Sequence, residues 1–218
     1  MMTVRVLIKK TLFFLLSPWL IVRRVSRAGR RIALTFDDGP HPDFTPSVLL
    51  LLKENNAKAT FFLLGHKVIA FPDLTRQIMA DGHEIASHAF LHHPLKGKPY
   101  AELKQELDRA DASLAPFRGE GQPPLFRPPY GTLSISLFIW AWRHRRKIVL
   151  WSLDPEDFSA LDINGPLRFF KENSIQPGEI ILLHDQSKMT VDLLETLLPE
   201  LRKDGFKMVS VSDLLERQ

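Results

Sequence analysis

The chain contains no cysteine, which excludes disulfide scaffolds, thiolate zinc sites and cysteine nucleophiles. It also lacks an apolar run close to the roughly 20 residues of a membrane-spanning helix, which excludes a multispan membrane protein. What it does contain is ordinary for a globular protein, since 44% of its 218 residues are hydrophobic and 25% are charged. This length suits one large domain better than two.

Acidic residues are missing from residues 1–31, which carry eight Lys and Arg side chains. The remaining residues hold 21 Lys and Arg against 25 Asp and Glu, so their net charge is −4, whereas the whole chain has +4. The basic character therefore belongs to an N-terminal arm, residues 1–30, and not to the body, residues 31–218. This distribution argues against a nucleic-acid-binding protein.

The arm contains an apolar run from Thr11 to Val22, with two basic residues on each side. As a helix the run would reach about 18 Å, too short for a hydrocarbon core of about 30 Å. Three interpretations stay open: an anchor at the membrane interface, a signal peptide cleaved after Ala28, and an ordinary helix packed on the body. We favour the anchor, because Trp19 and the basic flanks suit an anionic headgroup boundary. The expected location is membrane-associated or exported, with the extracytoplasmic side favoured and the cytoplasmic membrane face left open.

Short apolar or β-branched runs alternate with helical patterns throughout the body. The predicted strands are Ile32–Phe36, Ala59–Leu64, Glu84–Ala86, Lys147–Leu153, Ile180–His184 and Lys207–Val209. The predicted helices are Thr45–Asn55, Asp73–Asp81, Tyr100–Ala115, Ser134–His144, Gly165–Glu172 and Met189–Asp204. Such alternation predicts an α/β fold of repeated βα units with a parallel sheet or barrel.

Two neighbouring carboxylates, Asp37 and Asp38, come directly after the first predicted strand and precede a Gly-Pro pair. Such carboxylates repel, and a metal ion beside one of them relieves the repulsion and leaves the other free as a base. A simple Asp-Gly-Pro turn at the end of the strand is the alternative interpretation.

His88 and His92 are four residues apart, which is one turn of a helix, so both imidazoles can face one point. Asp38 could supply an oxygen ligand, and two His with one carboxylate leave open positions for water, as a hydrolytic metal requires. His93 would point about 100° away from His92 on the same turn. The alternative is a loop histidine pair with Phe90 packed beneath it.

The segment from Arg127 to Gly131 is typical of a rigid extended stretch that ends in a turn. A fixed guanidinium there could hold a carboxylate in one rotamer, and the backbone at Tyr130 could lend an N–H to an oxyanion. Asp157 and His184 follow two further strands, and an Asp that orients a His makes a general acid usable near neutral pH. Each of these residues alone also fits an ordinary structural position.

Three apolar residues close to these strand ends, Trp151, Phe158 and Leu182, are typical of a core but can also line a small apolar pocket. The basic run from Arg143 to Lys147 is typical of a solvated helix end, where cations are favourable.

Taken in order along the chain, these motifs resemble the polysaccharide deacetylases, also called the NodB-homology domain or carbohydrate esterase family four. The resemblance runs from about Arg31 to about Glu216. Its five motifs are Thr35-Phe-Asp-Asp-Gly-Pro40, His88-x-x-x-His92, Arg127-Pro-Pro-Tyr130, Asp154-Pro-Glu-Asp157-Phe158 and Leu182-Leu-His184. Any one motif is a weak signal, whereas five in the family's order make a chance match very improbable.

The resemblance implies a distorted (β/α) barrel with fewer than eight βα units. It implies the metal-dependent removal of an N- or O-acetyl group from a sugar, with Asp37 as catalytic base and Arg127 as its brace. Asp157 would tune His184, the general acid. The implied metal ligands are Asp38, His88 and His92. Zinc is the expected ion, with cobalt, nickel and manganese as alternatives. The residues expected around the substrate are Tyr130, Trp151, Phe158 and Leu182.

Two positions depart from the family pattern: Ala89 stands where Ser or Thr usually follows the first metal histidine, and Phe158 stands where Trp usually ends the fourth motif. The first departure removes a hydroxyl that would steady the loop carrying His88. Two alternatives to a glycan deacetylase stay open: a deacylase or deformylase of a lipid-linked sugar at the membrane, and a carbohydrate-binding pseudoenzyme. An acetylated glycan or amino sugar is the expected substrate, and no protein partner is predicted.

Overall fold

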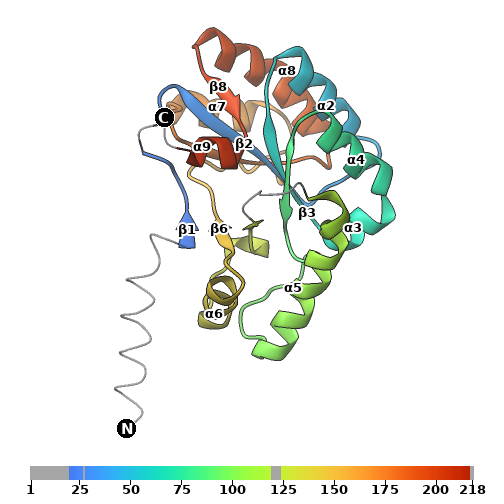
Figure 1. Ribbon diagram of the computed structural model, residues 1–218. Coiled ribbons are helices and arrows are strands. Elements are labelled where there is room, and N and C mark those ends of the chain that lie inside the picture. Colours follow the sequence, from blue (N-terminus) through green and yellow to red (C-terminus); the bar gives the residue numbers. More distant parts are fainter. Residues whose placement is uncertain (1–19, 27, 119–123, 217–218) are drawn as a thin grey trace.

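One parallel sheet organises residues 20–26, 28–118 and 124–216, which are the residues described by this computed structural model (Figure 1). Its strands follow the order β1-β6-β5-β4-β3-β2-β7, with β8 paired to β2. The strands are β1 Ile21–Val22, β2 Arg31–Asp37, β3 Ala59–Leu63, β4 Glu84–Ser87, β5 Leu125–Phe126, β6 Lys147–Val149, β7 Ile180–His184 and β8 Lys207–Val209.

Helices connect most of these strands and pack against the outside of the sheet (Figure 1). They are α2 Thr45–Glu54, α3 Gly65–Ala70, α4 Pro72–Ala80, α5 Tyr100–Leu114, α6 Ile135–Arg143, α7 Asn164–Glu172, α8 Lys188–Lys203 and α9 Val211–Leu215. The side chains of Ser134, Ser187 and Ser210 accept a backbone N–H at the start of α6, α8 and α9 and so fix where these helices begin.

The six predicted strands and six predicted helices are all present, and most of their ends are within two residues of the prediction. The predicted strand Lys147–Leu153 is shorter, because the carbonyl oxygens of Val149 and Leu150 accept bonds from Arg127. Four elements, β1, β5, α3 and α9, were not predicted, because they are two to six residues long and therefore too short to show a periodic pattern.

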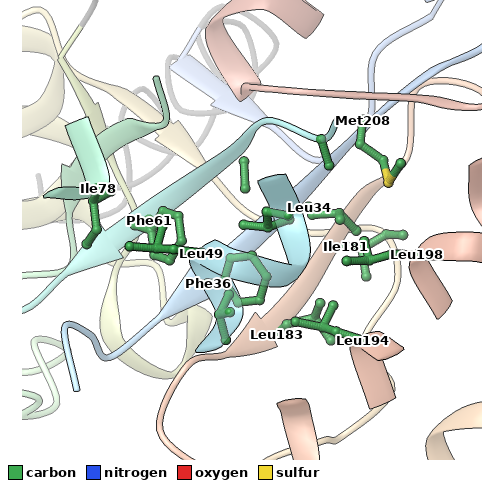
Figure 2. Packing of buried hydrophobic residues seen from close by; sticks show 14 of the residues in the cluster. Leu34, Phe36, Leu49, Phe61, Ile78, Ile181, Leu183, Leu194, Leu198 and Met208 are labelled. Carbon is green, nitrogen blue, oxygen red and sulfur yellow. The ribbon is translucent and has the colours of Figure 1, made fainter. Parts of the chain in front are cut away.

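Strand β2 shows how the sheet divides its side chains between two faces. Leu34 and Phe36 point to the outer face and pack with residues of α2, α8 and β7 in the main apolar core (Figure 2). Thr35 and Asp37 alternate with them and face the inside of the barrel, where Arg127 donates to both. The outer face therefore stabilises the fold, while the inner face carries polar groups toward the strand ends.

The sheet does not close into a complete ring, in agreement with the expected distorted barrel. An isolated bridge between Leu153 and Ile181 links the segment after β6 to β7. Residues 21–25 make a second link across the same gap, because β1 pairs with β6 while Arg24 forms a bridge with Glu179, just before β7. The gap between β6 and β7 is thus filled partly by residues that precede the first predicted strand.

Part of the segment assigned to the N-terminal arm, residues 1–30, packs against the sheet. Val22 and Ala28 are buried in an inner apolar cluster together with residues of β2, β3 and β7. This placement corrects the expectation that the first strand begins near Ile32. Residues 1–19, which include most of the apolar run of the arm, lie outside the described residues. Among the described residues, no helix is long and apolar enough to cross a bilayer.

Candidate metal centre and active site

A cleft of about 400 Å³ opens at the carboxyl ends of the strands. Asp37 on β2 and His184 on β7 lie on its wall as register partners on neighbouring strands. The other predicted site residues that line it are Asp38, His88, His92, Tyr130, Trp151, Phe158 and Leu182. Arg127 and Asp157 are buried, and each bonds directly to a residue of the wall. The structure therefore brings every predicted site residue into one region.

Arg127 holds Asp37 in a single orientation. Its guanidinium is fully buried and donates from Nη1 to Oδ1 of Asp37 at 2.6 Å. Its other N–H groups donate to Thr35 Oγ1 and to the carbonyl oxygens of Val149 and Leu150. Burial raises the pKa of the Asp37 carboxyl above its ordinary value, and the positive charge of Arg127 opposes that rise. The second carboxylate oxygen, Oδ2, lies 3.7 Å from Nε2 of His88.

Asp38, His88 and His92 each bring one ligand atom within 4.8 Å of the others. The Nε2 atoms of both histidines lie 3.5 Å from Oδ1 of Asp38. That oxygen is buried without a hydrogen-bond donor among the described residues, a costly state unless a cation satisfies it. Two imidazoles and a carboxylate are also a donor set that suits zinc. These three side chains therefore fit a divalent ion.

His88 is oriented by a hydrogen bond on the side away from the cleft. Its Nδ1 lies 2.9 Å from the carbonyl oxygen of Arg127. Because a carbonyl oxygen can only accept, Nδ1 carries the hydrogen and Nε2 keeps its lone pair toward Asp38. Burial lowers the pKa of His88 to about 3, although the charge of Asp38 opposes this, so the ring is neutral at neutral pH. A neutral imidazole is the form that binds a metal.

The helical turn expected between His88 and His92 is wrong, because both residues lie on a loop after β4. Ala89 has a φ of 70°, which no residue within a right-handed helix adopts. The two imidazoles still converge, with ring centres 5.2 Å apart. His93, which was discounted as a ligand, is exposed and lies outside the ligand group.

Backbone bonds hold this loop despite the strained conformation of Ala89. The N–H groups of Gly65 and His66, at the start of α3, donate to the carbonyl oxygens of Ala89 and Phe90 at 3.0 and 3.1 Å. Ala89 itself is fully buried. The loop is thus anchored by main-chain contacts that do not need the hydroxyl found at this position in the family pattern.

His184 and Asp157 form a second polar pair on the cleft. His184 Nδ1 lies 2.7 Å from Oδ1 of Asp157, and Oδ2 accepts from the His184 backbone N–H and from Thr190. Burial alone would lower the pKa of His184, but the hydrogen bond and charge of Asp157, with the charges of Asp37 and Asp38, raise it to about 9. His184 is therefore positively charged at neutral pH, with Nδ1 committed to Asp157.

Aromatic side chains surround these polar groups. The Phe158 ring packs edge-on to His184, with ring centres 5.3 Å apart, and the Tyr130 ring lies 4.4 Å from that of His92. Trp151 lies so close to Gly131 that a Cβ there would come within 2.7 Å of the indole, and Gly131 has a φ of 61°. Only glycine fits this position without strain. The cleft is thus lined by both apolar and polar side chains.

Two residues outside the predicted set, Asp185 and Gln186, contact the segment that carries Asp38. Gln186 donates to Oδ2 of Asp38 at 3.2 Å, the oxygen that does not face the histidines. Asp185 is buried under Gly39, where a Cβ would lie 2.5 Å from both of its carboxylate oxygens, and it accepts a bond from Thr45. Burial raises the pKa of Asp185 to about 6. Their one sequence signal is that they directly follow His184 at a strand end.

The sequence of this chain matches a known protein family. A sequence model of polysaccharide deacetylases matches residues 24–139, just over half of the chain. The chain belongs to the polysaccharide deacetylase family. This membership confirms the resemblance that the five motifs indicated. It also confirms the prediction that the chain is a hydrolase of the polysaccharide deacetylase type.

Individual relatives of this polysaccharide deacetylase match most of its length. A peptidoglycan-N-acetylglucosamine deacetylase of Bacillus cereus is 39% identical over 189 residues, which cover 84% of this chain and 87% of the relative. A chitooligosaccharide deacetylase of Azorhizobium caulinodans is 37% identical over 162 residues, covering 74% and 77%. Among solved structures, the Bc1960 peptidoglycan N-acetylglucosamine deacetylase has a TM-score of 0.83 at 31% identity and covers 91% of this chain and 93% of that one. The fold class is thereby confirmed.

Proposed function

We propose that this polysaccharide deacetylase removes the acetyl group from N-acetylglucosamine units of a glycan, in a reaction that depends on a divalent metal ion. One observation carries the proposal: Oδ1 of Asp38 is buried without a donor among the described residues and lies 3.5 Å from the Nε2 atoms of His88 and His92. The substrate class is supported by the relatives, which are named as deacetylases of peptidoglycan and of chitooligosaccharides.

Asp37 is the proposed general base. A divalent ion, held by the three ligands, would acidify a water molecule and polarise the acetyl carbonyl. Asp37 accepts the proton of the attacking water through Oδ2, because Arg127 occupies Oδ1. The raised pKa of the Asp37 carboxyl makes it a stronger base than an exposed aspartate. The backbone N–H of Tyr130 donates to the oxyanion that develops on the carbonyl.

His184 is the proposed general acid. It gives its proton to the departing amine, which leaves poorly as an anion. Asp157 keeps His184 charged at neutral pH, since the pKa of His184 is raised to about 9. Trp151, Phe158 and Leu182 line the cleft and suit the acetyl methyl group, from which they exclude water. The products are acetate and a free amino sugar.

The decisive experiment measures acetate release by the metal-free protein after reconstitution with zinc, cobalt, nickel or manganese. The substrates are chitooligosaccharides, peptidoglycan fragments, O-acetylated sugars and lipid-linked acetylated or formylated sugars. We expect activity to return with a divalent ion, zinc being the proposed native one, on N-acetylglucosamine oligomers. Activity confined to lipid-linked sugars would instead favour the membrane deacylase or deformylase. Glycan binding without acetate release under any metal would favour the pseudoenzyme.

We also propose that residues 1–19 attach the enzyme to an anionic membrane surface and that the catalytic domain begins near Leu20, outside the cytoplasmic membrane. The sequence of this segment supports the first part, because it combines Arg5, Lys9 and Lys10 with an apolar run and contains no acidic residue. The relatives named for peptidoglycan support the extracytoplasmic side. Cleavage after Ala28 is disfavoured, because it would remove β1 and the buried Val22.

Two truncations test this boundary. Deletion of residues 1–19 should leave a soluble enzyme that is active on a small acetylated glycan and binds anionic vesicles less tightly. Deletion of residues 1–30 removes β1 with the buried Val22 and Ala28, so the free energy of unfolding should fall by roughly 2–4 kcal/mol. Urea unfolding of both proteins measures the difference. Equal stability of the two truncated proteins would show that the domain begins near residue 31. A mature N-terminus at Gly29, measured by mass spectrometry, would show that the arm is a cleaved signal peptide.

A further inference from the structure

Helix α6 is apolar on its outer side as well as on its inner side. Leu137, Phe138, Trp140 and Ala141 are buried against the body. Ile135, Ile139 and Trp142 follow each other at helical spacing on the opposite side, and 49%, 40% and 60% of their surfaces are exposed. A helix on the surface of a soluble protein normally presents polar residues outward. We call these three residues the α6 face.

Cations continue the α6 face at the end of the helix. A hollow of about 600 Å³ there, the basic hollow, is lined by Leu20, Trp142, Arg143, Arg145, Arg146 and Lys147. Asp111 pairs with Arg146, but within the described part of the chain no carboxylate pairs with Arg143, Arg145 or Lys147. The basic hollow therefore carries an excess of positive charge, which favours an anionic partner.

The chain itself and a second copy are poor partners for this surface. Residues 1–19, which join the described chain at Leu20 in the wall of the basic hollow, contain only basic charges and cannot neutralise it. A two-fold pair of chains would place the same cations against each other, which is unfavourable. An anionic lipid surface suits both the basic hollow and the α6 face. Headgroup phosphates attract Arg and Lys, while Trp and Ile enter the acyl boundary.

We propose that the α6 face and the basic hollow together form a docking surface for an anionic phospholipid membrane. The folded domain then contacts the bilayer directly, beyond any attachment made by residues 1–19. Helix α6 begins a few residues after Tyr130 of the cleft, whereas the basic hollow lies at the start of β6, away from the carboxyl ends of the strands. The membrane contact is independent of the deacetylase proposal and can succeed or fail by itself.

Site-directed labelling tests the contact in the full chain, because a protein without cysteine takes a single nitroxide at any introduced cysteine. Ile139→Cys places the label on the α6 face, and Leu50→Cys places a matched label on the exposed side of α2. On addition of phosphatidylcholine vesicles containing phosphatidylglycerol, the accessibility of label 139 to a water-soluble nickel chelate should fall several-fold, while that of label 50 stays constant. If label 139 keeps its accessibility, or is protected before vesicles are added, the proposal is wrong.

Charge reversal supplies the second test. In vesicle flotation, Arg143→Glu with Arg145→Glu should weaken binding to phosphatidylglycerol vesicles at least about tenfold, because each cation near such a surface contributes roughly a fivefold gain. Lys53→Glu with Lys171→Glu, on α2 and α7, changes the net charge equally and should have much less effect. Both variants should keep the thermal unfolding temperature of the unmodified chain and its activity on a soluble chitooligosaccharide. Equal losses in the two variants, or none, would overturn the proposal, and sedimentation would reveal any change in self-association.

Discussion

Replacement of Asp157 by Asn should move the alkaline limb of the pH profile to lower pH. Asp157 contacts His184 twice, through Nδ1 at 2.7 Å and through the backbone N–H at 2.8 Å. The Asn side chain is nearly isosteric and can still accept from the backbone N–H. It carries no charge, however, and its amide would face Nδ1 as a donor, so the charged imidazole loses its principal support.

The size of the effect follows from the pKa of His184. Its rise from 6.5 to about 9 corresponds to roughly 3 kcal/mol of preference for the charged ring. Without the charge of Asp157, less opposes the effect of burial, and the pKa of His184 should fall back toward its ordinary value of 6.5. At pH 7.5 the protonated fraction then drops from nearly all to about one-tenth or less, so kcat/KM should fall about tenfold or more. The loss should shrink as the pH is lowered toward the new pKa.

The assay is acetate release by the reconstituted enzyme, measured as kcat/KM from weakly acidic to alkaline pH. A bound divalent cation repels the charged ring and lowers its pKa in every protein alike, so the shift between profiles is the quantity to compare. Thr190→Val removes a neutral donor to Asp157 at 2.8 Å and leaves the charge, so its alkaline limb should stay close to that of the unmodified enzyme. An unchanged alkaline limb in Asp157→Asn would refute His184 as the general acid.

Further substitutions separate the roles of the metal ligands, the general base and its brace. His88→Ala and His92→Ala should each lose bound zinc and activity, whereas His93→Ala should keep both, as elemental analysis and acetate release will show. Asp37→Asn should keep the metal and lower kcat by about 10²–10⁴, the usual contribution of a general base. Loss of the metal in this variant would instead show that Asp37 is the ligand and Asp38 the base. Arg127→Met leaves the Asp37 carboxylate buried without its cation and should lower the free energy of unfolding by about 3–5 kcal/mol, measured in urea. A matching Asp37→Asn in the same chain should restore part of that loss, and simple additivity would show that the two side chains are not coupled.

The long elements and the strand-end motifs could be predicted because each has a local cause. Alternation of Leu34 and Phe36 with Thr35 and Asp37 marks a strand with one face on the core. Three strands that end in Asp or His predicted a common site, since parallel strands place their carboxyl ends together. The cleft contains all three ends, with Asp37 and His184 in register on adjacent strands.

The geometry between the motifs could not be predicted, because it depends on contacts far apart in sequence. The spacing of His88 and His92 suggested a helical turn, whereas the loop at Ala89 is shaped by backbone bonds to Gly65 and His66. The same applies to Asp185 and its contact with Gly39, which only the pairing of β2 with β7 brings together. A four-residue spacing allows two imidazoles to converge in more than one conformation.

The role of β1 was not predicted for a similar reason. This strand affects the proposed base, Asp37, through a series of hydrogen bonds. The carbonyl of Val22 accepts the N–H of Leu150 at 2.7 Å, and the carbonyl of Leu150 accepts from Arg127 at 3.2 Å. Arg127 in turn holds Asp37 at 2.6 Å. Two residues at the end of an apolar run carry no strand pattern of their own, yet they fix the segment that positions the brace of the base. Loss of β1 should therefore lower kcat as well as stability, while the metal ligands on other elements keep their ion.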